Sequence, residues 1–377
     1  MKKYIIAADI SLRAPLHITS TESGKYDPLS GRILRYDAPT GVGCSLTRTV
    51  PLAELAQAST HGSGNDIPRV PTIPASTVGG KLRRAAAALL HESMVKRSLQ
   101  LSPNAYNMMT TGMATTDLNA DAATPEVVRA ARLDPFLGCF GGSSFALSAN
   151  TVVSEGWPLL EITSGRFMTE PILPVSQLAK LNEMTSAMAI VRKNDVAELK
   201  ASILDQLIGV EALANFFEAE GTARTKSKAN KEAGESGKKT DLRTFNAAEV
   251  VNSGLSFGLR VAVVSRTPAH IGLMILAVQK MLRDGQIGGK RARGLGSFVC
   301  PAGASRLYDV DPATGVVSGG ALLFGEQASG YGVQESAFLD ECITAAQDYI
   351  DECDPRLYEA FASVNAKAIK ALTEAVQ

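Results

Sequence analysis

The pattern of apolar residues predicts two strands that would pair in the core of the protein. "KYIIAADISL" (residues 3–12) and "SGLSFGLRVAVV" (residues 253–264) have the β-branched enrichment typical of strands, and Asp9 is a polar interruption of the first. "LGSFVCP" (residues 295–301) predicts a further, short strand, and "PLLEITSGRFMTEPIL" (residues 158–173) predicts strand with turns.

The sequence also predicts helices. Residues 77–97 contain a run of alanine and leucine between cations and predict a helix with Ser76 or Thr77 as its N-cap. "TPAHIGLMILAVQKMLRDGQ" predicts a second helix, with Thr267 as N-cap and Pro268 at its first position. Weaker helical patterns occupy residues 175–184 and 195–220. The tail from 334 to 372 is amphipathic and is interrupted at Asp354-Pro355.

Strand, helix, glycine turn and strand in this order form half of a ferredoxin-like split βαβ unit, and residues 3–97 would supply the other half. We therefore expect an α+β fold. Residues 19–43 predict a long loop, and residues 98–150 a loop-rich inserted region. Residues 221–243 carry seven Lys or Arg and three acids, and predict a mobile loop.

The charge of the chain is unevenly distributed. Of 377 residues, 45% are hydrophobic and 20% charged, which is typical of a globular protein. Residues 301–377 hold 12 acidic and 4 basic side chains, so residues 1–300 have a basic excess. Five scattered cysteines without C-x-x-C spacing indicate the cytoplasm, and the apolar run "HIGLMILAV" is too short to span a membrane. We expect no membrane association and no cofactor.

The segment "IGGKRARGLGSF" (residues 287–298) combines four glycines with three cations. Glycine lets another backbone approach closely, and Gly289, Lys290, Arg291 and Arg293 would present amide donors and positive charge to phosphates. The segment lacks the serine or threonine of a P-loop and is not a G-x-G-x-x-G fingerprint. An ordinary connection between helix and strand is the alternative.

The start of the first predicted helix makes a second, independent candidate. Ser76 and Thr77 precede Gly79, Gly80 and Lys81, so free amides, the positive end of the helix dipole and a cation would lie together. Arg83 and Arg84 extend the charge along the next turn. A polyanion across one face of the sheet would meet both candidates. A capped helix with solvated cations is the alternative.

Four segments in this order resemble the RAMP superfamily of CRISPR-Cas proteins, and within it the backbone subunit of multi-subunit effector complexes. The segments are "LRAPLHITS" (12–20), "PTIPASTVGGKLR" (71–83), "FNAAEVVNSGLSFGLRV" (245–261) and "IGGKRARGLGSF" (287–298). The second has Ala75 where the family usually has glycine. The long loop between His17 and Pro71 and the altered "IPASTVGG" look most like the type IV backbone protein.

The resemblance implies a modified RRM-like palm over residues 1–300, with a finger-like region at about 98–150 and a thumb at about 166–250. Residues 301–377 would be an acidic C-terminal helical extension. The chain would bind CRISPR RNA and polymerise along it with neighbouring copies and other effector subunits. Target nucleic acid, with DNA favoured, would be reached by guide pairing, and a DinG-type helicase is a further implied partner.

The resemblance places the following residues on the RNA: Arg13, His17, Ser76, Thr77, Lys81, Arg83, Arg84, Gly289, Lys290, Arg291 and Arg293, with Lys226 and Lys228 at the tip of the thumb. The chain is expected to be a non-catalytic scaffold.

Three alternatives remain open. A type III-like backbone would cleave target RNA through Asp37, or its rival Asp27, with a divalent ion. A CRISPR RNA-processing endoribonuclease would use His17 as general base. A metabolic enzyme would bind a small phosphorylated ligand.

Overall fold

The computed structural model describes most of the chain in two compact units. The described residues are 2–27, 32–34, 42–52, 69–113, 124–142, 147–192, 244–311, 313–327, 330–333 and 336–374. The first unit consists of Met1–Glu22, Leu46–Ser186 and Glu249–Gln377, and the second of Ser23–Ser45 and Ala187–Ala248.

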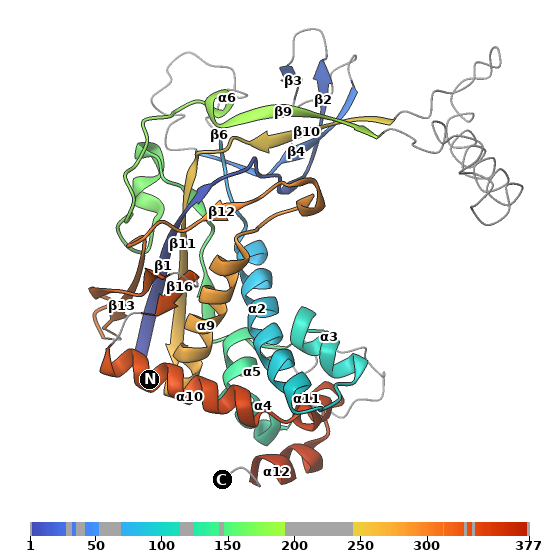
Figure 1. Ribbon diagram of the computed structural model, residues 1–377, viewed down its shortest axis with the longest axis vertical. Coiled ribbons are helices and arrows are strands. Elements are labelled where there is room, and N and C mark those ends of the chain that lie inside the picture. Colours follow the sequence, from blue (N-terminus) through green and yellow to red (C-terminus); the bar gives the residue numbers. More distant parts are fainter. Residues whose placement is uncertain are drawn as a thin grey trace, which may run out of the picture. The chain divides into compact units, whose positions relative to one another are not determined.

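A seven-stranded antiparallel sheet forms the centre of the first unit (Figure 1). β1 (Lys2–Leu12) pairs along nearly its whole length with β11 (Ser256–Ser265), from Lys2 opposite Ser265 to Ser11 opposite Ser256. The remaining strands are β7 (Thr151–Val153) and β8 (Trp157–Pro158) beside β11, and β12 (Phe298–Val299), β13 (Ser305–Val310) and β14 (Val317–Leu322) on the other side. β1 is therefore a central strand with partners on both edges.

The order of these strands defines the fold class. Along the chain β1, α2 (Ala75–Lys96), β7, β11, α9 (Pro268–Asp284) and β13 follow one another, and in the sheet the order is β13-β1-β11-β7. This antiparallel arrangement is that of a ferredoxin-like unit. The predicted α+β fold is confirmed.

The main core lies between this sheet and helices α2, α9 and α10 (Ala337–Glu352), and α9 packs against both of the others (Figure 1). Side chains alternate between the faces of a strand. Alternate residues of β1 therefore join the α9 side chains in one apolar cluster. Among its members are Tyr4, Ile6, Ala8, Ile10 and Leu12 with Ile271, Met274, Ile275 and Val278.

Residues 98–150, predicted to be loop-rich, contain three short helices. They are α3 (Pro103–Thr111), α4 (Pro125–Leu133) and α5 (Pro135–Phe140). Each begins with a proline after a capping side chain, namely Ser102, Thr124 or Asp134. With α11 (Pro355–Ala362) they bury a second apolar cluster, so this part of the prediction is wrong.

Other segments also differ from the sequence-based expectations. The predicted loop at 19–43 contains β2 (Thr19–Asp27), β3 (Arg32–Leu34) and the start of β4 (Val42–Thr47). α2 begins at Ala75 after Pro74, without a side-chain cap, so Ser76 and Thr77 lie inside its first turn instead of capping it. Residues 158–184 form little regular structure beyond the 3₁₀ turn η2 (Glu161–Arg166) and α6 (Leu181–Met184), so both the strand and the helix predicted there are largely wrong.

The C-terminal region combines strands with the expected helices. The helical prediction is confirmed for α10, α11 and α12 (Ala366–Glu374), with the break at Asp354-Pro355. Residues 305–333, in contrast, form β13, β14, β15 (Phe324–Gln327) and β16 (Gly330–Val333). The extension is thus not wholly helical, because β13 belongs to the central sheet beside β1.

In the described part of the second unit the order of strands is β3-β2-β4-β10-β9, and β10 (Thr244–Val251) runs parallel to β4 beside β9 (Thr185–Arg192). A separate pair in the first unit joins β5 (Thr49–Pro51) to β6 (Arg69–Pro71). Residues 195–220 and 221–243, for which a helix and a loop are predicted, lie outside the described residues. No helix in the described ranges is long and apolar enough to cross a membrane.

Candidate nucleic-acid interface

The glycine-rich segment is a tight connection between α9 and β12. α9 ends at Gly285, which adopts the left-handed conformation at φ 56° and donates its amide to Met281 O at 3.2 Å. Further positive φ angles follow, at Gly288 (84°), Lys290 (56°), Gly294 (78°) and Gly296 (76°), around the 3₁₀ turn η4 (Arg291–Arg293). The glycine content therefore follows first from the conformation of the backbone.

This segment packs directly on the residues after β1. The amide of Gly289 donates to His17 O at 2.9 Å, and that of Gly296 donates to Pro15 O at 2.9 Å. The Arg13 amide donates in turn to Ser297 O at 2.9 Å. A Cβ atom on Gly288 would stand 2.8 Å from His17 O. The predicted role of Gly289 in binding RNA is therefore corrected, because its amide is already bonded to the protein. Gly288 and Gly296 also pack closely on the protein, whereas a Cβ atom on Gly294 would meet nothing within 4 Å.

The same packing places Arg13 beside a segment that carries three more cations. Arg13, Arg291 and Arg293 are exposed and Lys290 is half-buried. Within the described ranges, Arg13, Arg291 and Arg293 form no ion pair. Arg13, Lys290, Arg291 and Arg293 together are called the glycine-loop surface below. Exposed guanidinium groups without a carboxylate partner favour phosphate as ligand.

The start of α2 reaches the same end of α9. Lys81 Nζ lies 2.7 Å from Asp284 Oδ2, at the last residue of α9 before the glycine-rich segment, and the Lys81 side chain is 12% exposed. Ser76 and Arg84 are exposed and Thr77 is half-buried. The charge of Lys81 is therefore balanced by a carboxylate of the protein, whereas Arg84 adds to the exposed positive charge.

Arg83 serves a structural purpose instead of the predicted contact with RNA. Its side chain is buried and donates to four backbone carbonyls, those of Met108 (2.6 Å), Met109 (2.8 Å), Phe140 (3.0 Å) and Gly141 (3.2 Å). Burial lowers the pKa of its guanidinium to about 10, so it stays charged at neutral pH. Arg83 therefore joins α2 to α3 and α5 and is not available to RNA.

His17 is also buried, which corrects its predicted role in RNA binding. Its Nδ1 lies 2.7 Å from Glu249 O and its Nε2 lies 3.3 Å from the Thr19 hydroxyl. Burial lowers the pKa of the imidazole, so the ring is neutral at pH 7. The Glu249 carboxylate accepts from Thr47 N at 3.0 Å and from the Thr185 hydroxyl at 3.1 Å. A histidine enclosed in this way cannot act as a general base on an RNA strand, and the endoribonuclease alternative loses its candidate residue.

For four sequence candidates the structure describes no side chain. Lys226, Lys228 and Asp37 lie outside the described residues. Of Asp27 only the backbone is described, opposite Arg32 in the pairing of β2 with β3.

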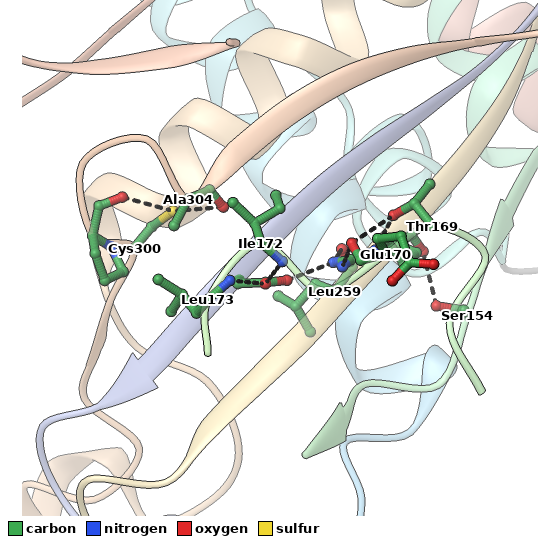
Figure 2. Close-up of polar contacts among 11 residues, drawn as sticks. Ser154, Thr169, Glu170, Ile172, Leu173, Leu259, Cys300 and Ala304 are labelled. Carbon is green, nitrogen blue, oxygen red and sulfur yellow. Dashed lines mark hydrogen bonds and ion pairs between the residues drawn. The ribbon is translucent and has the colours of Figure 1, made fainter. Parts of the chain in front are cut away.

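A buried ion pair on the sheet face away from the helices was missed by the sequence analysis. Arg260 Nη1 lies 2.7 Å from Asp9 Oδ1, and both side chains are fully buried. Arg260 also donates to the Thr169 hydroxyl at 2.6 Å and to Glu170 O at 3.1 Å. Figure 2 shows Ile172 and Leu173, whose amides donate to Asp9 Oδ2 at 2.5 and 2.9 Å. A charged residue inside each of two apolar strands was the available signal.

This network holds residues 169–173 against the sheet, and every polar atom of the pair has a partner. Arg260 Cζ lies 5.3 Å from the centre of the Phe167 ring, which covers the guanidinium. A pair that is fully buried and fully bonded leaves no position for a ligand. We regard it as part of the scaffold that supports β1 and β11.

No protein-family model and no curated protein sequence matches the chain. Among solved structures, a chain described as "Type IV-B CRISPR Complex" matches with a TM-score of 0.40 and 13% identity, over 84% of this chain and 93% of that one. A chain of "Cryo-EM structure of the Type III-B Cmr-beta bound to cognate target RNA" matches with a TM-score of 0.34 and 10% identity, over 81% and 61%. At these values the function has to be argued from the residues of this chain.

Proposed function

We propose that this protein is an RNA-binding backbone subunit of an RNA-guided CRISPR effector complex, in which neighbouring copies line the guide RNA. The proposal rests on the four segments that resemble the RAMP backbone family. It is supported by one structural observation: two of these segments, 12–20 and 287–298, lie side by side. The hydrogen bond from Arg13 N to Ser297 O, 2.9 Å long, joins them and brings Arg13 to the glycine-rich segment.

The proposed binding is electrostatic. Each cation that neutralises a phosphate releases a counterion, so the affinity is expected to fall steeply with salt and to vary little with sequence. Sequence specificity would come from base pairing of the guide with its target. Ser76, Thr77 and Arg84, together with Lys81, would extend the phosphate contacts along the start of α2.

We propose further that the subunit is non-catalytic. The burial of His17 favours this over an RNA-processing enzyme. Assignment to type IV, a DNA target and a DinG-type helicase partner rest on the resemblance alone. So does a filament of neighbouring copies with other effector subunits.

The experiment that tests this function is salt-dependent binding of a labelled single-stranded RNA. The variant Arg13→Gln/Arg291→Gln/Arg293→Gln removes three cations of the glycine-loop surface. Lys96→Gln/Lys180→Gln/Lys367→Gln removes three exposed cations elsewhere and is the matched control. With about 0.7 counterion per phosphate on single strands, the slope of log K against log salt should become about 2 less steep in the first variant only. Equal slopes in both variants would refute the assignment.

A second readout uses the assembled complex. The protein co-expressed with its neighbouring components should carry an RNA of uniform length, and the glycine-loop variant should carry less. A purified protein that carries no nucleic acid, and binds a small phosphorylated metabolite instead, would favour the metabolic alternative.

A further inference from the structure

A second group of arginines lies at the opposite end of α9. An open hollow of about 470 Å³ is lined by Pro125, Val128, Arg129, Arg132 and Arg266. All three arginines are exposed, and in the described part of the chain none of them forms an ion pair. Arg129, Arg132 and Arg266 are called the arginine hollow below. Three like charges around one space repel one another unless an anion enters.

The carboxylate of Glu126, next to the lining residue Pro125, is engaged at the start of its own helix. Glu126 stands in the first turn of α4, where hydrogen bonds from its own backbone amide and from Thr124, followed by the charge of Arg129, lower the pKa of its carboxyl. It therefore satisfies the start of its own helix, and its side chain does not line the hollow. Glu126 thus offsets part of the charge of Arg129, and within the described residues Arg132 and Arg266 have no ion-pair partner.

The two walls of the hollow are held together by a buried histidine. His270 Nδ1 lies 2.8 Å from the Thr267 hydroxyl, and its Nε2 lies 3.3 Å from Arg132 O. A Cβ atom on Gly138 would stand 2.6 Å from Nε2, so the ring is closely packed. Arg132 on α4 and Arg266 before α9 are therefore carried by elements fixed to each other. A fixed spacing of the two backbones reduces the ordering entropy that binding would cost.

The start of α9 adds to the positive potential. Its N-cap residue Thr267 makes no side-chain cap, since its hydroxyl is bonded to His270, and Pro268 follows at the first position. Pro268 has no amide and the His270 amide donates to Thr267 O at 3.1 Å, so the contribution of this first turn is the positive end of the helix dipole. Arg266 directly precedes this turn, so the dipole reinforces the charge of the arginines.

We propose that the arginine hollow binds the phosphodiester backbone of a nucleic-acid strand, at a surface separate from the glycine-loop surface. α9 has 17 residues, and the two surfaces lie at its two ends, about 25 Å apart along its axis. Planar guanidinium groups match phosphate oxygens in pairs, and all three cations here are arginine. The proposal goes beyond the proposed function and does not depend on it.

Phosphate fits this surface better than an acidic protein does. The cores of protein–protein interfaces are depleted in charged residues and enriched in aromatic side chains. The hollow offers only Pro125 and Val128 as apolar lining, and three of its five residues are charged. A flexible phosphodiester chain needs no such apolar core.

The test compares Arg129→Gln/Arg132→Gln/Arg266→Gln with the control Lys96→Gln/Lys180→Gln/Lys367→Gln in the full-length protein. Both lose three exposed cations. Binding of labelled RNA, single-stranded DNA and duplex DNA is measured between 50 and 200 mM salt. If the variant loses contacts to three phosphates, its affinity should fall less between 50 and 200 mM salt than the affinity of the control. The difference between the two falls should be a factor of about 20 for single strands and about 40 for duplex. The nucleic acid whose salt dependence changes in the arginine-hollow variant is the one that the hollow binds.

Each outcome decides the proposal. A salt dependence equal to that of the control in all three arms, or no binding by the wild-type protein in any arm, overturns it. Unchanged nucleic-acid binding with a changed sedimentation coefficient assigns the hollow to an acidic surface of another copy, which also overturns it. The glycine-loop variant separates the two hypotheses: loss of binding in the arginine-hollow variant alone would support this site and contradict the proposed function. An unfolding midpoint equal to that of the control shows that each variant is folded.

Discussion

Lys81 and Asp284 form an ion pair between the beginning of α2 and the end of α9, with Nζ 2.7 Å from Oδ2. The lysine is one of the cations predicted to lie on RNA, and the carboxylate offsets its charge. A phosphate at this position would have to compete with Asp284. The pair therefore limits how much Lys81 contributes to binding.

We predict that Asp284→Asn increases the affinity for single-stranded RNA several-fold at 50 mM salt, because the charge of Lys81 is then uncompensated. Lys81→Gln should weaken binding and reduce the salt slope by about 0.7. Neither change should alter the free energy of unfolding by more than about 1 kcal/mol, since Asp284 is 44% exposed. An affinity that is the same in Asp284→Asn as in the wild type would exclude Lys81 from the interface.

Arg83 provides a contrast with its neighbour Arg84. Arg83→Gln leaves four carbonyls without their charged donor. A buried polar group left unsatisfied costs about 1–3 kcal/mol, so we predict a loss of at least about 3 kcal/mol in the free energy of unfolding. The affinity of the folded fraction for RNA should not change. Arg84→Gln, on the exposed side, should leave stability within about 0.5 kcal/mol of the wild type and weaken RNA binding. Urea unfolding measures the stability of the two variants, and RNA titration measures their affinity. A stable Arg83→Gln variant with weakened RNA binding, beside an unstable Arg84→Gln variant with unchanged binding, would contradict the structure.

The buried ion pair between Asp9 and Arg260 is expected to contribute to the free energy of unfolding. Asp9→Asn removes one charge and leaves Arg260 buried and uncompensated, so we expect a loss of about 3–5 kcal/mol, measured by urea unfolding. Glu92→Gln breaks the exposed pair with Lys280 and should cost at most about 1 kcal/mol. A small effect of Asp9→Asn, similar to that of Glu92→Gln, would show that the pair does not stabilise the sheet.

Asp134 links the pH to the stability of the helical cluster. Burial raises the pKa of its carboxyl from 3.8 to about 6, against hydrogen bonds from Leu137 N (2.7 Å) and the Tyr349 hydroxyl (3.0 Å). Between these two values the folded state binds more protons than the unfolded state, so the free energy of unfolding falls as pH rises. We predict that this fall, about 2 kcal/mol between pH 4 and 6.5, is absent from Asp134→Asn. Parallel pH profiles of the two proteins would disprove the link.

The elements that the sequence predicted well are those with a strong local signal. β1 and β11 are continuous apolar runs, and α9 begins at Thr267-Pro268 as expected. β13 was missed because "SRLYDV" is short and holds three polar or charged residues, and its position beside β1 is set by pairing with a strand some 300 residues earlier.

The candidate site was predictable in its charge but not in its packing. Arg83 and Arg84 are adjacent in an alanine-rich helix, where no apolar stripe distinguishes the buried position from the exposed one. His17 and Gly288 are in close proximity through a contact between residues 271 apart in the chain. Local sequence carries no information on such a contact, so glycines required by the protein itself were assigned to RNA.

The central position of β1 also affects how the chain folds during its synthesis. Lys2 pairs with Ser265, and Lys3 pairs with both Val264 and Val310, so neither neighbour of this strand exists when it leaves the ribosome. At 5–20 residues per second, about 15–60 s separate the emergence of β1 from that of β13. Throughout that interval an apolar segment has no native partner on one edge, which makes the nascent chain a natural client for chaperones.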